Sequence, residues 1–205
     1  MIETVTVVPS ALLLLPEYAG RDDAGADLRG AAVELLRDLA GRSVVLVVGG
    51  DREPRSTKPA VGRRVGQLLL RLAGVAAADV VEVPWDAPLE VCRTLGEALA
   101  AAPGELDLLV VADGSARRGE KAPGHLDERA LPFDEGLVAA LASADAAGLL
   151  ALDPALAADL LVQGRAPLQV AAAAMGGAAY RPVRVEASDP FGVLYVLARL
   201  ERGGS

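Results

Sequence analysis

The chain has 205 residues, of which 52% are hydrophobic and only 3% aromatic, and its formal net charge is -8. This length and aliphatic content predict one domain with a single packed core. The negative charge and the scattered arginines argue against a nucleic-acid partner, because phosphate binding needs clustered positive charge.

The hydrophobic pattern alternates between short β-branched runs and helical spacing. In chain order it predicts a strand over 2–8, a helix over 27–40, a strand over 43–48, a helix over 61–72, a strand over 80–83, a helix over 88–102, a strand over 106–112, helices over 133–144, 154–161 and 164–175, and strands over 183–187 and 193–200. Strands that alternate with helices predict an α/β fold with a mostly parallel central sheet flanked by helices. We assign residues 1–200 to this single domain and expect 201–205 to be a frayed tail.

The first residues favour a strand and a loop over a targeting segment. They carry Glu3 and no basic run, and Pro9 and Pro16 interrupt the apolar part. No stretch reaches membrane-spanning length without a charge or a turn residue. We therefore expect a cytoplasmic protein with no membrane partner. Cys92 is the only cysteine, which excludes an intramolecular disulfide, and its helical context predicts a buried apolar residue.

Three predicted loops follow strand ends, at 9–26, 49–59 and 113–132. In parallel sheets, binding sites form beyond the carboxyl ends of the strands. The candidate pocket therefore consists of the polar residues near the start of these loops, namely Ser10, Asp51, Asp113, Ser115 and Arg117. We expect Asp113 to cap backbone N–H groups of its own loop. The remaining charges of the third loop predict a structural network of ion pairs, formed by Arg118, Lys121, Asp127, Arg129 and Asp134.

Other chemistries fit these loops less well. The two glycines after 43–48 lack the Gly, Lys and Ser/Thr spacing of a phosphate loop. Ser115 lacks the flanking glycines of a hydrolase nucleophile, and His125, the only imidazole, lies in a turn-rich stretch typical of a solvated side chain. A hard cation such as Mg²⁺ could use Asp51, Asp113 and Asp127, although loop capping and arginine pairing is the simpler interpretation of these acids.

The third loop also carries a pattern of motifs. Residues 112–117 read ADGSAR, residues 123–129 read PGHLDER, and Phe133-Asp134 follows. These runs resemble the G-D-L-S-H-R, P-x-G-x-D-x-R and F-D motifs of the class III extradiol ring-cleavage dioxygenases, in the branch of the catalytic β subunit of protocatechuate 4,5-dioxygenase. The likeness continues through LDPALAADLLVQGRAPLQVAAAAMGG at 152–177 and VVPSALLLLPE at 7–17. It covers most of the chain and implies the α/β fold of an extradiol dioxygenase catalytic chain.

The resemblance implies a site in which two histidines and one carboxylate hold Fe(II), with a further histidine as acid/base. At the matching positions this chain carries Ser10, Gly50-Asp51, Ala116 and Val162-Gln163. His125 does not replace them, since it lies where the family's loop has a residue that is not a ligand. The expected Fe(II) ligands are thus missing, and we expect no cofactor.

Three hypotheses follow. The first is a pseudoenzyme that has lost Fe(II) binding and ring cleavage and binds an unidentified small molecule or a partner chain, as a homodimer or with a heteromeric partner. The second is a superfamily enzyme with another site, built from Asp51, Asp113 and Asp127 around a hard metal, or from Ser10 and Ser115 with the arginines around an anionic substrate. The third is a true ring-cleaving oxidoreductase, which needs a partner chain to supply ligands.

Overall fold

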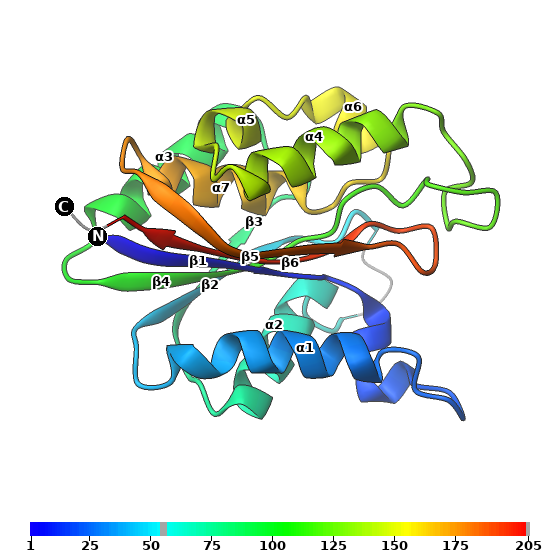
Figure 1. Ribbon diagram of the computed structural model, residues 1–205, viewed down its shortest axis with the longest axis horizontal. Helices are drawn as coiled ribbons and strands as arrows, with labels where there is room; N and C mark the ends of the chain where they lie inside the picture. The colour runs from blue at the N-terminus through cyan, green and yellow to red at the C-terminus, as the bar shows by residue number, and fades with distance from the viewer. Residues whose placement is uncertain (54–56, 204–205) are drawn as a thin grey trace.

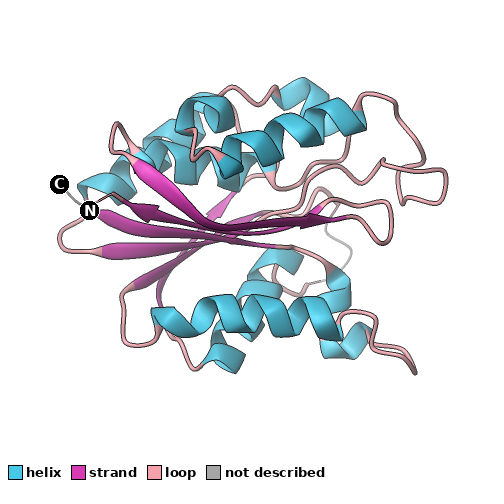
Figure 2. Ribbon diagram, viewed as in Figure 1, coloured by secondary structure: helices cyan, strands magenta, loops and turns pink. Residues whose placement is uncertain are grey.

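The computed structural model describes residues 1–53 and 57–203 as a central sheet between two layers of helices (Figure 2). The strands of the described chain are β1 (Ile2–Val8), β2 (Val44–Gly49), β3 (Ala77–Val83), β4 (Leu106–Val111), β5 (Tyr180–Ser188) and β6 (Tyr195–Arg202). Its helices are α1 (Ala26–Leu36), α2 (Val61–Ala73), α3 (Leu89–Ala101), α4 (Ala130–Ala142), α5 (Ala146–Leu150), α6 (Pro154–Asp159) and α7 (Arg165–Met175). Short 3-10 turns cover Leu12–Leu14, Pro16–Tyr18 and Arg37–Leu39.

The described strands form one mixed sheet in the order β3-β2-β4-β1-β6-β5. The first four are parallel: β4 pairs with β1 and β2, and β2 pairs with β3. The last two are antiparallel, because β6 runs back beside β1 and β5 runs back beside β6. The prediction of an α/β fold with a mostly parallel, helix-flanked sheet is confirmed at this level.

Helices cover both faces of the sheet (Figure 1), and each face buries its own layer of apolar side chains. Side chains alternate along each strand, so that in β4 Leu108 and Val110 pack beneath α4 and α7, whereas Leu109 and Val111 face α1 and α2. All four are fully or almost fully buried. Because both faces are covered, the central strands are mainly apolar, although Thr4 and Thr6 of β1 and Asp107 of β4 are buried among them.

The differences from the predicted elements lie at exposed positions. β3 begins at Ala77, three residues before the predicted strand, because the residues at its start are exposed at the edge of the sheet and carry no apolar signal. α5 was not predicted; it has only five residues, and Asp145 caps it. The prediction of a frayed tail is wrong for Glu201 and Arg202, which form the end of β6. Residues 204–205 of that tail lie outside the described residues.

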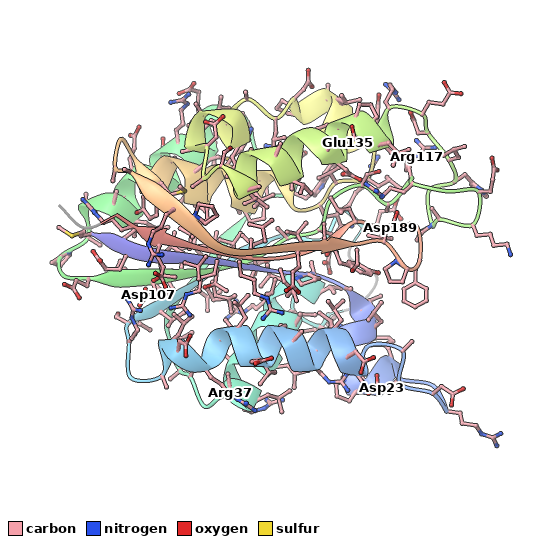
Figure 3. The ribbon with its side chains drawn as sticks, in the orientation of Figure 1. Asp23, Arg37, Asp107, Arg117, Glu135 and Asp189 are labelled. Carbon is pink, nitrogen blue, oxygen red and sulfur yellow. The ribbon has the colours of Figure 1, made fainter. Side chains whose placement is uncertain are left out.

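The carboxyl ends of the four parallel strands lie together, where the strands leave the sheet. The long loop that carries Arg117 extends from this end of the strands, whereas Asp107, at the start of β4, lies at their opposite end (Figure 3). Within the described chain, no helix combines the length and the apolarity needed to cross a membrane.

Candidate ligand-binding cleft

A cleft of about 940 Å³ opens beyond the carboxyl ends of β1, β2 and β4. All three predicted loops contribute to it, together with the start of α2, the α6–α7 connection and the start of β6. Its wall is mainly aliphatic, formed by Ala11, Leu12, Leu13, Pro59, Val61, Ala116, Pro123, Leu161 and Val193. Its polar residues are Ser10, Tyr18, Asp51, Arg52, Glu53, Arg64, Asp113, Gln163 and Tyr195.

Strand alternation places two of these polar residues on one side of the sheet. Asp113 continues the buried row of Leu109 and Val111, which faces α1 and α2. Asp113 also forms an isolated antiparallel bridge with Tyr195, and directly opposed residues point to the same face. Ser10 lies just beyond the end of β1, the strand between β4 and β6.

Asp113 is a carboxyl group with a single hydrogen bond. The backbone N–H of Ser10 donates to its Oδ1 atom at 2.8 Å. Within the described chain no group donates to Oδ2, and no arginine or lysine pairs with this carboxylate. Burial raises the pKa of Asp113 to about 7, and the Ser10 hydrogen bond only partly opposes that shift. The side chain is therefore poised between its neutral and charged forms near neutral pH.

Tyr195 lies across the bridge from Asp113 and is only 5% exposed. It lines the cleft, and its hydroxyl group has no hydrogen-bond partner among the described residues. Burial raises the pKa of Tyr195 to about 12, and the neighbouring Asp113 carboxylate adds to the shift. Tyr195 therefore stays neutral and can donate or accept one hydrogen bond inside the cleft.

Asp51 lies on the opposite rim, at the end of β2. Its Oδ1 atom accepts the backbone N–H of Val61 at 2.9 Å, so it satisfies a free donor at the first residue of α2. Gly62 in the same turn lies against Ser10; a Cβ atom there would approach the Ser10 hydroxyl to 3.2 Å. The start of α2 is thus held close to the end of β1.

The two cleft arginines are engaged with groups other than the cleft carboxyls. Arg64 donates to Glu17 at 2.6 Å and lies over the ring of Tyr18, with 5.4 Å from its Cζ atom to the ring centroid. Arg52 donates to the carbonyl of Ala158 at 2.8 Å and lies 4.9 Å from the ring centroid of Trp85. These contacts hold the guanidinium groups at the rim.

Two residues of the predicted pocket lie elsewhere, so the prediction is wrong for Ser115 and Arg117. Ser115 is fully buried; its hydroxyl donates to Leu160 O at 3.2 Å and accepts the Arg117 N–H at 3.0 Å. Arg117 donates to the carbonyls of Gly124 and Asp159 at 2.7 and 2.9 Å. Both residues fasten the third loop to the α6 region instead of facing the cleft.

The predicted ion-pair network exists in most of its parts. Arg118 binds the fully buried Asp134 at 2.9 Å and Asp189 at 2.8 Å. Arg129 forms an ion pair with Asp127 at 2.9 Å, and Arg117 lies 3.8 Å from the same Asp127 oxygen. The side-chain hydrogen bond from Arg129 is the main cause that lowers the pKa of Asp127 to about 2.

Two details of this network were predicted wrongly. Lys121 is exposed and pairs with no acid in the described chain. Asp113 caps Ser10 in the first loop rather than its own loop; the acid that caps the third loop is Asp134, which accepts the Ser115 N–H at 2.8 Å. The two capping bonds, from Ser10 to Asp113 and from Ser115 to Asp134, join residues that are close in the fold but not adjacent in the sequence.

The acids of the metal hypothesis do not converge. Asp51 and Asp113 line the cleft, but Asp127 is held outside it by Arg129. The described residues contain no group of three or more His, Cys, Asp or Glu side chains that could hold a metal ion. His125 is exposed, as expected of a solvated turn residue, and Cys92 is fully buried, where burial raises the pKa of its thiol.

Sequence reasoning did not identify Tyr195, Arg64 or Tyr18 as cleft residues. Tyr195 becomes a neighbour of Asp113 only because β6 runs antiparallel to β1, a long-range pairing with no local signal. Arg64 lies in the first turns of α2, where a basic residue is unremarkable. A scan against protein-family models found no match to the chain, and a search of curated proteins found none.

Proposed function

We propose that the protein binds a small organic molecule in this cleft, on an extradiol dioxygenase-like scaffold that has lost Fe(II) binding and ring cleavage. The observation that carries the proposal is the cleft itself, about 940 Å³ in volume with an aliphatic wall and a few convergent polar groups. Ligand sites typically have this size and this composition, and in α/β sheets they lie beyond the carboxyl ends of the strands.

The positions of the missing iron ligands support the dioxygenase-like part of the proposal. Ser10, Asp51, Ala116 and Gln163, which stand at or beside the family's catalytic positions, all line this one cleft. Their side chains offer a hydroxyl, a capping carboxylate, a methyl group and a carboxamide. This set does not fit an Fe(II) centre of two imidazoles and a carboxylate, so we derive no step through iron.

A fragment screen by ligand-observed NMR tests the binding function. Ala116 lines the cleft, so Ala116→Leu narrows it, whereas Ala98→Leu adds the same side chain at an exposed position of α3. We expect fragments that bind the wild-type protein and the Ala98→Leu variant but bind Ala116→Leu at least tenfold more weakly. Fragments that bind all three proteins equally, or no binding at all, would overturn the proposal.

The pKa of Asp113 favours a second candidate, an enzyme that uses this carboxyl as a general acid or base. A pKa of about 7 is close to the best value for proton transfer at neutral pH. Oδ2 is the atom that would give or take the proton, since Oδ1 already accepts the Ser10 N–H. Solvent deuterium exchange into bound fragments, catalysed by the wild type and lost in Asp113→Asn, would distinguish this enzyme from a binding protein.

A further inference from the structure

Two carboxyl groups of the cleft have no cation partner within the described chain, which sets them apart from the acids of the neighbouring loop. Asp127, Asp134 and Asp189 each bind an arginine. Asp51 and Asp113 each accept only one backbone N–H, through Oδ1, and pair with no arginine or lysine of the described chain. In each of the two, no group of residues 1–53 and 57–203 donates to the second carboxylate oxygen.

The two described arginines that line the cleft are engaged with other groups. Arg64 is neutralised by Glu17 and stacks on Tyr18, and Arg52 lies on Trp85. Both contacts hold positive charge at the rim, where it interacts with groups other than Asp113. The negative charge at the base of the cleft therefore has no counter-ion from the described residues around it.

Tyr195 offers a second polar group at the same place. It is more than nine-tenths buried, with only 5% of its surface exposed, it lines the cleft, and its hydroxyl group has no partner among the described residues. The hydroxyl oxygen is not one of the described buried polar atoms that lack a partner, so it reaches the open space of the cleft and is accessible to a ligand there. Tyr195 and Asp113 are directly opposed in their bridge, so their side chains point to the same face of the sheet, and one ligand group can approach both.

We propose that the ligand of the cleft is an organic amine, whose ammonium group binds Asp113 and Tyr195 while its hydrocarbon part packs on the aliphatic wall. This inference rests on the proposed binding function and names the ligand's chemical class. The ammonium group donates one hydrogen bond to Asp113 Oδ2 and a second to the Tyr195 oxygen. Asp51, on the opposite rim, adds attraction for the same charge.

An amine suits this site better than an alcohol or a carboxylate of similar shape. A charge-assisted hydrogen bond to a carboxylate is roughly twice as strong as a neutral one, and it favours the charged form that burial opposes in Asp113. An alcohol leaves that charge uncompensated. A carboxylate ligand adds a like charge beside Asp51 and Asp113, which is unfavourable in a partly desolvated cleft.

Three probes of matched shape test the inference: cyclohexylmethylamine, cyclohexylmethanol and cyclohexanecarboxylate. Their affinities are measured at pH 7.5 from the amide NMR shifts of cleft residues such as Gly114 and Val193. We expect the amine to bind at least tenfold more tightly than the alcohol, and the carboxylate to bind most weakly. Asp113→Asn, which keeps an acceptor for the Ser10 N–H, abolishes the preference, and Tyr195→Phe reduces it.

Glu120→Gln is the matched control, because it removes one negative charge from an exposed position of the third loop, outside the cleft. It should leave the amine affinity unchanged. Equal binding of amine and alcohol, or tighter binding of the carboxylate, would overturn the amine inference but leave the binding function in place. Shifts with none of the probes would also overturn the inference, and the broader fragment screen would then decide the binding function.

Discussion

The backbone N–H of Ser10 donates to the carboxylate of Asp113 across 103 positions of sequence, and this hydrogen bond joins the ends of β1 and β4 at the base of the cleft. It occupies one oxygen of the carboxyl group and orients the other. Asp113 is thus both a structural link and a titratable group of the cleft.

The raised pKa of Asp113 predicts that stability falls as pH rises. The folded protein holds the Asp113 proton up to pH about 7, whereas the unfolded chain loses it near 3.8. The folded state therefore binds more protons than the unfolded state between these values, and its advantage is complete below pH 4 and lost by pH 7. We expect this group to lower the free energy of unfolding by on the order of 4 kcal/mol over that range.

Asp113→Asn isolates this contribution, since asparagine does not titrate. Chemical denaturation at pH 4, 5.5 and 7.5 should show a smaller loss of stability with rising pH in the variant than in the wild type. Parallel pH profiles for the two proteins would show that Asp113 has an ordinary pKa, and the general acid or base candidate would then lose its support.

The pair of Arg118 and Asp134 predicts a large loss of stability when the arginine is removed. The Asp134 side chain has no exposed surface, and Arg118 is the cation at 2.9 Å. Arg118→Met leaves a buried carboxylate without its partner, which should cost about 3 kcal/mol in the free energy of unfolding.

Arg129→Met is the control for this prediction. The Arg129 side chain is 54% exposed, and exposed ion pairs contribute little to stability. Thermal unfolding should therefore show a clear decrease in melting temperature for Arg118→Met and almost none for Arg129→Met. Similar decreases for both would mean that the whole loop network, rather than the buried pair, stabilises the fold.

The close packing around Gly164, at the start of α7, predicts that this position tolerates no side chain. A Cβ atom at this position would lie 2.7 Å from the backbone nitrogen of Asp113 and 2.8 Å from the Ala112 Cβ atom. Gly164→Ala should therefore push α7 away from β4, lower stability and displace Asp113. Gly136→Ala, in α4, meets no atom within 4 Å and should stabilise the helix by about 0.5–1 kcal/mol. Equal melting temperatures for the two variants would contradict this packing.

Local patterns in the sequence were sufficient to predict the α/β fold and the location of the cleft. Alternating strands and helices, together with the rule that sites lie at the carboxyl ends of parallel strands, led to the three loops that form it. Ser10, Asp51 and Asp113 line the cleft because each closely follows a parallel strand. The same rule could not tell that Ser115, two residues beyond Asp113, turns into the packing below α6.

The remaining features depend on pairings between distant segments. Tyr195 reaches Asp113 only through the antiparallel insertion of β6 beside β1. Arg129 and Arg118 of the third loop form ion pairs with Asp159 and Asp189, which come from a later helix and a later turn. Residue type alone indicated that these arginines form ion pairs, but the choice of acid depends on the tertiary fold.

The central proposal is that the cleft binds a small molecule on a dioxygenase-like scaffold without iron chemistry. The direct measurement is to purify the protein anaerobically, add Fe(II), determine bound iron by mass spectrometry, and follow oxygen uptake with catechol and protocatechuate. We predict no stoichiometric iron and no uptake, because the matching positions carry Ser10, Asp51, Ala116 and Gln163. One bound iron per chain with ring cleavage would contradict the claim and place the iron ligands at other residues.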